Sequence, residues 1–314
     1  MKNKKNILLL GGFGFLGTNI LKFVDSYLSE LYQCVVFDKF SCHPCGLEFN
    51  CINNVYAGDF SDDVLLEKIF QEKSLDMVIH VLSTTIPIDS TNAQYDVQSN
   101  LIPTLNVLNC MVKYNVSSIV YLSSGGAIYG SQGNQLHAES DDVFPISSYG
   151  VIKLAIEKYI MQYAQLYKIH PLIIRLSNPY GPYHYSMKQG IVNVAIQKAI
   201  TGETLTIWGD GCGKKDYIYV ADFVDILFKL VHDQNFSGVV NVGSGRTASV
   251  NDIVREIQCN IPSLKCEYTQ AQTFDVSNFE LDITKLKTII GKYTFTSLTD
   301  GIAKTIQWRT EICN

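Results

Sequence analysis

The chain has 314 residues, of which 46% are hydrophobic and 18% are charged, and its formal net charge is −5. This length predicts one large globular domain or two interlocked ones, and no run approaches the roughly 20 apolar residues that cross a bilayer. The acidic balance gives no broad basic surface, which argues against a protein that binds nucleic acid or a membrane.

The N-terminal segment MKNKKNILLLGGFG places lysines before an apolar run, as secretory signals do. Glycines interrupt that run within a few residues and no small-residue cleavage site follows, so we expect a cytoplasmic protein. Nine cysteines, an odd number in a chain of this size, favour reduced thiols over a disulfide framework. The CHPC segment at residues 42–45 is only half of a zinc motif, and we expect free thiols and no metal site there.

The first half of the chain alternates short apolar runs with longer helical patterns. Near-continuous apolar runs are typical of parallel strands that helices cover on both faces. We predict strands at residues 6–11, 33–38, 55–58, 76–82, 118–124 and 171–177, and helices at 15–31, 61–72, 95–114 and 148–167. This repetition predicts an α/β fold with a doubly wound parallel sheet over residues 1–177.

After residue 178 the pattern changes to shorter, mixed elements. We predict helices at 189–201, 221–233 and 249–259, and strands at 204–208 and 239–243. No linker rich in proline or serine separates the two halves of the chain. We therefore expect a smaller mixed α/β substrate lobe over residues 178–314, interleaved with the first lobe and sharing one cleft with it.

Gly11, Gly14 and Gly17 form a GxxGxxG pattern between the first predicted strand and the first helix. Such glycines permit a tight turn, a close approach of the backbone to a pyrophosphate and a close helix contact, with the phosphates at the helix N-terminus. Asp38 ends the second strand, where a carboxylate accepts hydrogen bonds from ribose hydroxyls and repels a 2′-phosphate. The pattern predicts a site for NAD rather than NADP. Asp59, after the third strand, either reaches the adenine or caps the next helix.

Tyr149 and Lys153 lie four residues apart at the start of a predicted amphipathic helix, and so share one face. A tyrosine with a pKa near ~10 is a poor base at neutral pH, but a neighbouring ammonium group and a nicotinamide cation both stabilise the phenolate. Tyr149 can then exchange a proton with a substrate hydroxyl. The pair occurs often by chance, but it is more specific downstream of a dinucleotide motif with a hydroxyl-bearing turn, SSGGAIYG, between them.

Together these motifs resemble the extended short-chain dehydrogenase/reductase family, and within it the NAD-dependent, UDP-glucose 4-epimerase-like nucleotide-sugar epimerases and dehydratases. Three further segments follow in the family's order: RLSNPYGP at 175–182, IWGDGCGKKDYIYVADFV at 207–224 and NVGSG at 241–245. The resemblance implies a Rossmann domain that holds NAD, a C-terminal lobe for a UDP- or dTDP-sugar, and commonly a homodimer through a four-helix bundle. The implied cofactor contacts are Gly11, Gly14, Phe15, Leu16, Gly17, Asp38, Asp59, Phe60, Asn100, Tyr149 and Lys153.

The catalytic turn departs from the family pattern. The family's catalytic Ser or Thr lies four residues before the tyrosine of IYG, and this chain has Gly125 there. Ser124 and Ser123 are the nearest hydroxyls, and either one is a candidate to replace it. The 4,6-dehydratases carry an acid pair directly after their Thr, where this chain has Gly126 and Ala127, so we do not expect dehydration.

The expected substrate contacts also differ from the family. The two arginines that hold the diphosphate correspond here to Lys215 and to Gln272, three residues before Asp275, and the loss of bidentate donors weakens the usual clamp. Lys214, Lys215 and Arg246 are candidate substitutes. Four other residues stand where the family contacts the sugar: Ser83, Thr84, Thr85 and Asn178.

We therefore expect a 4-epimerase of a UDP- or dTDP-hexose, working in polysaccharide biosynthesis. Tyr149 is the expected acid and base on the C4 hydroxyl, through a transient 4-keto sugar. Lys153 lowers the tyrosine pKa and holds the ribose, and Ser124 or Ser123 polarises the C4 oxygen. Two alternatives stay open: an NAD(P)H-dependent 4-ketoreductase of a dTDP- or UDP-6-deoxyhexose, and an NAD-binding regulatory protein with impaired catalysis.

Overall fold

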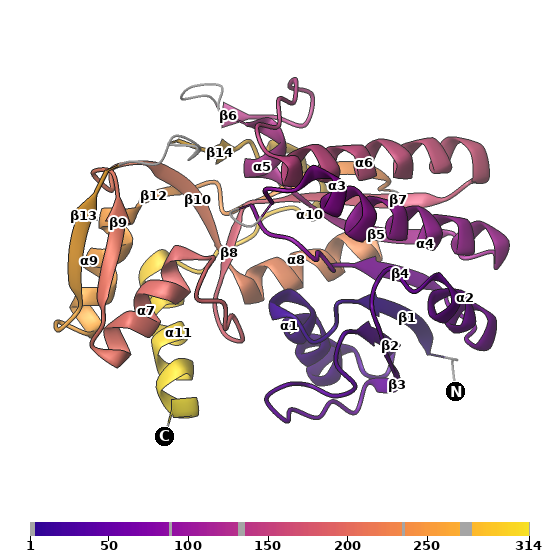
Figure 1. Cartoon of the computed structure of the whole chain (residues 1–314), viewed down its shortest axis with the longest axis horizontal. Coiled ribbons are helices and arrows are strands. Elements are labelled where there is room, and N and C mark those ends of the chain that lie inside the picture. The colour runs from indigo at the N-terminus through magenta and orange to yellow at the C-terminus, as the bar shows by residue number, and fades with distance from the viewer. Residues whose placement is uncertain (1–3, 88–89, 131–135, 234–235, 271–277, 314) are drawn as a thin grey trace.

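The computed structural model describes residues 4–87, 90–130, 136–233, 236–270 and 278–313. Its larger lobe is built on a seven-stranded parallel sheet with the strand order β11-β7-β5-β4-β1-β2-β3 (Figure 1). These strands are β1 (Lys5–Leu10), β2 (Tyr32–Asp38), β3 (Ile52–Ala57), β4 (Met77–His80), β5 (Ser118–Ser124), β7 (His170–Leu176) and β11 (Gly238–Val242). The predicted doubly wound α/β fold is confirmed.

Helices cover both faces of this sheet, and the alternation of side chains along β1 shows why its sequence is apolar throughout. Ile7 and Leu9 pack on the face that carries α1 (Phe15–Phe23) and α8 (Val220–His232). Leu8 and Leu10 pack on the opposite face. That face is covered by α2 (Asp63–Glu72), α4 (Ile102–Lys113) and α6 (Ser148–Tyr167). A strand buried on both sides has no polar face to alternate with.

Two predicted helices are shorter than their sequence patterns. The helix expected at 15–31 ends at Phe23, and a π-helical turn over residues 24–28 follows it. The helix expected at 95–114 divides into α3 (Ala93–Asp96), a π-helical turn over residues 97–101, and α4. Pro103 falls in the first turn of α4 and has no amide hydrogen to donate back into the π-helical turn that precedes it.

The smaller lobe contains a three-stranded sheet and a two-stranded sheet with their own apolar core. The three-stranded sheet consists of β8 (Asn178–Tyr180), β10 (Lys214–Tyr219) and β12 (Thr247–Ser249), and the other of β9 (Thr204–Trp208) and β13 (Lys265–Thr269). Helices α7 (Ile191–Thr201), α9 (Val250–Asn260) and α11 (Leu298–Cys313) pack around them. Four short elements complete the described chain: α5 (Gly125–Tyr129), β6 (Leu136–His137), β14 (Glu280–Leu281) and α10 (Thr284–Ile290).

The chain crosses between the lobes more than once. Strand β11 pairs with β7 at the edge of the large sheet, and α8 packs against α1, although both follow residue 178 in sequence. The predicted strand at 239–243 therefore extends the large sheet. No helix in the described ranges has the length and apolar character to span a membrane.

Candidate active site

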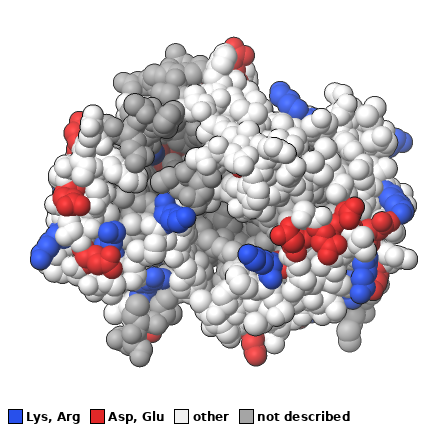
Figure 2. Space-filling view, viewed as in Figure 1, with Lys and Arg blue, Asp and Glu red and all other residues white. Residues whose placement is uncertain are grey.

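A cleft with a volume of about 1050 Å³ opens between the two lobes, at the carboxyl ends of the large sheet's strands. Figure 2 shows the hollow in the centre of the viewed face. Acidic and basic side chains are scattered around it, and the basic ones form no continuous surface on this face. Most of the predicted site residues line it: Gly11, Gly14, Phe15, Leu16, Gly17, Asp38, Asp59, Phe60, Ser83, Thr84, Thr85, Ser123, Ser124, Tyr149, Lys153, Asn178 and Lys215.

The remaining candidate contacts considered in the sequence are not part of the described cleft lining. Asn100 lines a smaller cavity behind the cleft, and Arg246 is exposed and is not part of the described cleft lining. Gln272 and Asp275 lie outside the described residues. Of the three candidate diphosphate contacts Lys214, Lys215 and Arg246, only Lys215, on β10, is part of the described cleft lining.

The glycine turn leads from β1 into α1 and has the packing that a dinucleotide site needs. A Cβ atom at Gly17 would lie 2.2 Å from the Gly11 carbonyl oxygen, so a side chain there would separate the turn from the helix. A Cβ atom at Gly14 would meet only the Gly11 carbonyl oxygen, at 3.5 Å, so the missing side chain leaves open space in the cleft. Gly14 is also the N-cap of α1, where free amides and the helix dipole favour an anion.

Asp38 is held in place at the end of β2. The side chain is only 7% exposed, and its two oxygens accept hydrogen bonds from the Phe13 amide at 2.9 Å and the Phe40 amide at 3.3 Å. A fixed carboxylate at the edge of the cleft retains lone pairs for ribose hydroxyls. The open glycine turn and this carboxylate together fit a dinucleotide such as NAD.

Asp59 does not cap the following helix. Its carboxylate accepts hydrogen bonds from the Ser61 amide at 2.9 Å and the Ser61 hydroxyl at 2.6 Å, whereas Asp62 caps α2 by accepting from the Leu65 amide at 2.9 Å. Of the two alternatives for Asp59, helix capping is therefore wrong. Asp59 remains in the cleft lining beside the buried Phe60.

The predicted catalytic pair lies on the first turns of α6, whose N-terminus is capped by the Ser147 hydroxyl. Burial raises the pKa of Tyr149 to about 12, and the neighbouring Ser124 side chain, within hydrogen-bonding reach, opposes that rise. Lys153 Nζ donates a hydrogen bond to the Leu122 carbonyl at 2.9 Å. Burial lowers the pKa of Lys153 to about 8, partly offset by the Glu157 carboxylate. Tyr149 is thus a protonated phenol with a buried cation beside it.

The structure gives a physical reason for Gly125. A Cβ atom there would lie 2.9 Å from Phe279 Cζ and 3.0 Å from Leu281 Cδ2, so these side chains fill the space that a serine or threonine would need. Ser124 lines the cleft within reach of Tyr149. Ser123 also lines the cleft, but it is 5% exposed and its Oγ has no hydrogen-bond partner in the described part of the chain. The geometry favours Ser124 over Ser123 as the catalytic hydroxyl.

Asn100 holds the loop after β4. Its Oδ1 accepts a hydrogen bond from the Thr84 amide at 2.9 Å. Thr84 and Ser83 hydroxyls donate to Ser99 Oγ and to the Thr85 carbonyl, at 2.7 and 2.9 Å, so both hydroxyls are satisfied within the loop. The three loop residues remain in the cleft lining, and Asn100 sets their position from behind.

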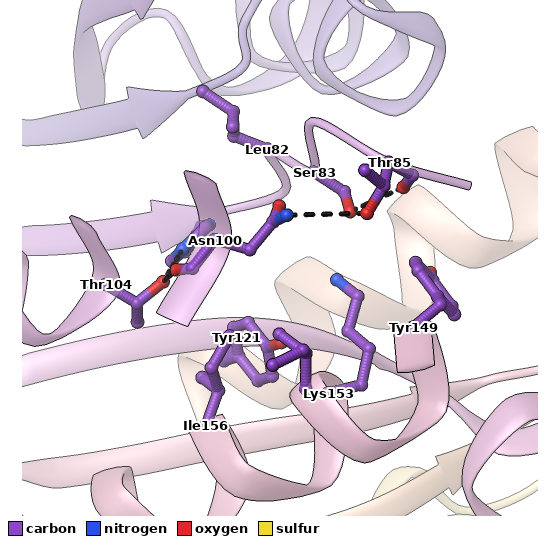
Figure 3. Close-up of a pocket in the computed structure, with 11 residues that line it drawn as sticks. Leu82, Ser83, Thr85, Asn100, Thr104, Tyr121, Tyr149, Lys153 and Ile156 are labelled. Atoms are coloured by element: carbon purple, nitrogen blue, oxygen red, sulfur yellow. Dashed lines mark hydrogen bonds between the residues drawn. The ribbon is translucent and has the colours of Figure 1, made fainter. Parts of the chain in front are cut away.

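The small cavity behind the catalytic pair has a volume of about 10 Å³, close to that of one water molecule (Figure 3). Besides Asn100, Tyr149 and Lys153, it is lined by His80 and Tyr121. The Thr104 hydroxyl donates to the Asn100 carbonyl, so it accepts the hydrogen of His80 Nε2 at 3.0 Å. Burial lowers the pKa of His80 to about 3, and the imidazole is neutral.

Asp216 does not line the cleft but supports the elements around it, a role that the sequence did not predict. It is fully buried, and its carboxylate accepts hydrogen bonds from the Ser244 amide at 2.9 Å and the Gly245 amide at 3.1 Å. Asn178 Nδ2 donates to the Asp216 carbonyl at 2.8 Å. These bonds join the NVGSG loop, β8 and β10 behind Lys215. The available signal was the charged triplet KKD inside an otherwise apolar strand.

The CHPC segment is a packed loop. His43 is buried, with Nδ1 accepting from the Cys45 amide at 3.1 Å and Nε2 bonded to Thr18 Oγ1 at 3.0 Å, so both ring nitrogens are used. The Cys42 and Cys45 thiols are exposed. Within the described ranges, no group of three or more His, Cys, Asp or Glu side chains is placed to hold a metal ion.

A family model described as the NAD dependent epimerase/dehydratase family matches residues 7–243. The chain belongs to this family. It is 31% identical over 305 residues to a Methanocaldococcus jannaschii protein provisionally named UDP-glucose 4-epimerase, covering 96% of this chain and 97% of that protein. It is 26% identical over 308 residues to an Escherichia coli dTDP-4-dehydro-6-deoxyglucose reductase, covering 97% of each.

A crystal structure of Thermotoga maritima UDP-glucose 4-epimerase with UDP-glucose superposes with a TM-score of 0.89. It is 28% identical and covers 98% of this chain and 100% of that one. The predicted family and cofactor are confirmed: the protein is an NAD-dependent enzyme of the nucleotide-sugar epimerase, dehydratase and reductase group. In this chain, the open space beside Gly14 and the Asp38 carboxylate are the features that fit NAD.

Proposed function

We propose that this enzyme is a 4-epimerase of a UDP- or dTDP-hexose. The observation that carries the proposal is the placement of Ser124 beside the Tyr149 phenol, with the Lys153 ammonium behind it, in the cleft that also contains the glycine turn. The Methanocaldococcus and Thermotoga relatives named for 4-epimerase activity support it, because the similarity extends over nearly the whole chain.

The reaction needs one group that exchanges a proton with the C4 hydroxyl and one that stabilises the negative charge on the C4 oxygen. NAD, which the glycine turn and Asp38 would hold, would supply the hydride chemistry at the sugar's C4. The Lys153 ammonium and a bound nicotinamide cation favour the phenolate form of Tyr149, which accepts the C4 hydroxyl proton as the carbonyl forms and gives it back as the carbonyl is reduced, so no net proton or electron is consumed. Ser124 donates a hydrogen bond to the C4 oxygen, where negative charge develops.

Lys153 supports the proton exchange from behind. One of its three N–H groups is bound to the Leu122 carbonyl, which leaves two for a ribose hydroxyl and its surroundings. Its positive charge stabilises the phenolate that Tyr149 becomes during each cycle. On the substrate side, we propose Lys215 and Asn178 as the contacts of the diphosphate sugar, with Ser83, Thr84 and Thr85 near the pyranose.

The catalytic turn argues against dehydration. Gly126 and Ala127 line the cleft next to Ser124, and neither carries a group that could move a proton to or from carbon. A 4,6-dehydratase needs such a pair to eliminate water. The proposed enzyme therefore returns its 4-keto sugar to the hexose level.

A homodimer is the proposed assembly. Exposed apolar side chains lie along α6 and at the start of α4, its neighbour on one face of the large sheet (Figure 1). They are Ile102 on α4 and Val151, Tyr159, Met161, Leu166 and Tyr167 on α6. A second copy that packs the same two helices against these would form a four-helix bundle and cover the apolar surface. A cytoplasmic location stays a prediction.

The test of the 4-epimerase proposal is incubation with a panel of UDP-, dTDP- and GDP-hexoses without added NAD(P)H. NMR reads the configuration at C4, and absorbance reads the reduced cofactor in the protein. We expect interconversion of two C4 epimers of a UDP- or dTDP-hexose by protein that carries its own NAD. Absence of any epimer across the panel, by folded protein with bound NAD, would exclude this function.

One relative supports a second candidate, a 4-ketoreductase of a 6-deoxyhexose nucleotide. The Escherichia coli dTDP-4-dehydro-6-deoxyglucose reductase matches this chain from end to end. Such an enzyme would use Tyr149, Lys153 and Ser124 in the same positions, but only in the direction of reduction. Turnover that strictly requires added NADH or NADPH, and stops when it is exhausted, would select the ketoreductase.

A further inference from the structure

Lys153 stands between two tyrosine rings. Its Nζ lies 5.0 Å from the centroid of the Tyr121 ring and 5.6 Å from that of Tyr149. Tyr149 is on α6 with Lys153, whereas Tyr121 is on β5 and is fully buried. Figure 3 shows the Lys153 side chain rising between the two rings at the small cavity.

The groups that face this ammonium from the surrounding elements do little to neutralise it. His80 on β4 is neutral because burial holds its pKa near 3, and Asn100 carries no charge. Glu157 on α6 attracts the ammonium, but its carboxylate is also paired with Arg175 Nη2 at 2.9 Å. A buried ammonium with so few opposing charges loses much of its hydration without full compensation.

The face of an aromatic ring attracts a cation within about 6 Å, and the attraction is larger when the pair is removed from water. We propose that Tyr121 is a positioning residue for the reaction, which holds the Lys153 ammonium against the catalytic tyrosine through the face of its ring. The proposal rests on the function proposed above in one respect, because that function makes Lys153 part of the catalytic machinery.

The ring, rather than the hydroxyl, is the group that acts. Within the described part of the chain, the Tyr121 hydroxyl is buried and has no hydrogen-bond partner. The ring itself is fixed by an edge contact with His80, at 5.3 Å between centroids and 75° between planes. Replacing Tyr121 with phenylalanine therefore keeps the proposed contact, and replacing it with leucine or methionine removes it.

The test is an NMR titration of lysine labelled with 13C at Cε, in the full chain with bound NAD. Lys153 is assigned as the signal lost in Lys153→Ala. We expect Tyr121→Leu to lower the titration midpoint of Lys153 by about one pH unit, since the ring stabilises the charged form. Tyr121→Phe should leave the midpoint within about 0.3 units of wild type.

Tyr114→Leu is the matched control, because the Tyr114 ring centroid lies 5.5 Å from the Nζ atom of the exposed Lys113 and Tyr114 lines neither the cleft nor the small cavity. It should leave the Lys153 midpoint unchanged. An unchanged midpoint in Tyr121→Leu, or an equal shift in Tyr121→Phe, would overturn the proposal. If Tyr121→Leu does not fold, Tyr121→Met takes its place.

A second measurement uses proton chemical shifts instead of a titration. Protons over the face of a ring are shielded, so the Lys153 Hε signals of wild-type protein should lie upfield of those of the other lysines and stay there in Tyr121→Phe. Unshielded Hε signals would contradict the ring contact. Both readings are independent of turnover, so a failure to epimerise any hexose would count against the proposed function and leave the Tyr121 result intact.

Discussion

The Ser124 hydroxyl lies within hydrogen-bonding reach of the Tyr149 phenol, while the next position, Gly125, is packed against Phe279 and Leu281. A side chain at position 125 would crowd Phe279 and Leu281, and in the proposed mechanism the preceding residue, Ser124, supplies the hydroxyl instead. The last residue of β5 thus lines the cleft, and we propose that it acts there as well as leading into the turn.

Ser124→Ala should therefore lower kcat by about 10²- to 10³-fold, the range found when a donor to a developing oxyanion is removed. Ser123→Ala is the matched comparison, one residue away and equally small. It should change kcat by less than about threefold, because Ser123 Oγ makes no hydrogen bond to any group in the described part of the chain. Steady-state kinetics of the two variants decides the assignment, and a larger loss in Ser123→Ala would reverse it.

The glycine turn offers a second matched pair. With NAD removed from both proteins, Gly14→Ala should melt near the wild-type temperature but bind NAD more weakly, because its methyl group enters the open space beside the helix N-terminus. Gly17→Ala should lower the melting temperature itself, because its methyl group meets the Gly11 carbonyl at 2.2 Å. Thermal melts and NAD titration by calorimetry measure both. Tight NAD binding by Gly14→Ala would contradict the placement of the pyrophosphate.

The pH dependence of the reaction should report Lys153. Burial lowers its pKa from 10.5 to about 8, so the ammonium predominates at neutral pH and its proton is lost as the pH rises through 8. The neutral amine no longer stabilises the Tyr149 phenolate, and kcat/KM should fall on the alkaline side. In Lys153→Arg the side chain keeps its charge, so kcat/KM should not fall at alkaline pH. A wild-type kcat/KM that stays level to about pH 10 would contradict the lowered pKa.

The dimer prediction depends on the apolar stripe of α4 and α6. Leu166→Glu places a charge at the exposed end of that stripe, and it should shift the protein from dimer to monomer in sedimentation velocity with little effect on the melt of the monomer. Val64→Glu, on the exposed face of α2, is the control, because it also replaces an exposed apolar residue but lies off the stripe. Wild-type protein that sediments as a monomer would exclude the bundle.

The sequence predicted the strands of the large sheet well, because burial on both faces leaves an apolar run as plain as that of β1. The position of the cleft could also be predicted, because the glycine turn, Asp38 and Tyr149 follow particular strands and helices in the predicted order. It did not decide between Ser123 and Ser124, because that depends on Phe279, more than 150 residues away in the chain.

The smaller lobe was harder to predict. Strands β10 and β13 were missed because half-polar sequences such as KKDYIY and KCEYT carry no long apolar run. The roles of Asp216 and Asn100 were also hidden, since each acts by holding a loop through backbone amides, and no local pattern in the sequence records which amides fold back onto a side chain.

The central claim is that Tyr149 moves the C4 proton of a nucleotide-bound hexose in both directions with NAD retained. The most direct measurement is NMR of UDP- and dTDP-hexoses incubated with wild-type protein and with Tyr149→Phe, both checked for bound NAD and with no cofactor added. We predict a mixture of C4 epimers with wild type and none with Tyr149→Phe at equal NAD content. Equal epimer formation by both proteins, or formation by wild type only when NAD(P)H is supplied, would contradict the claim.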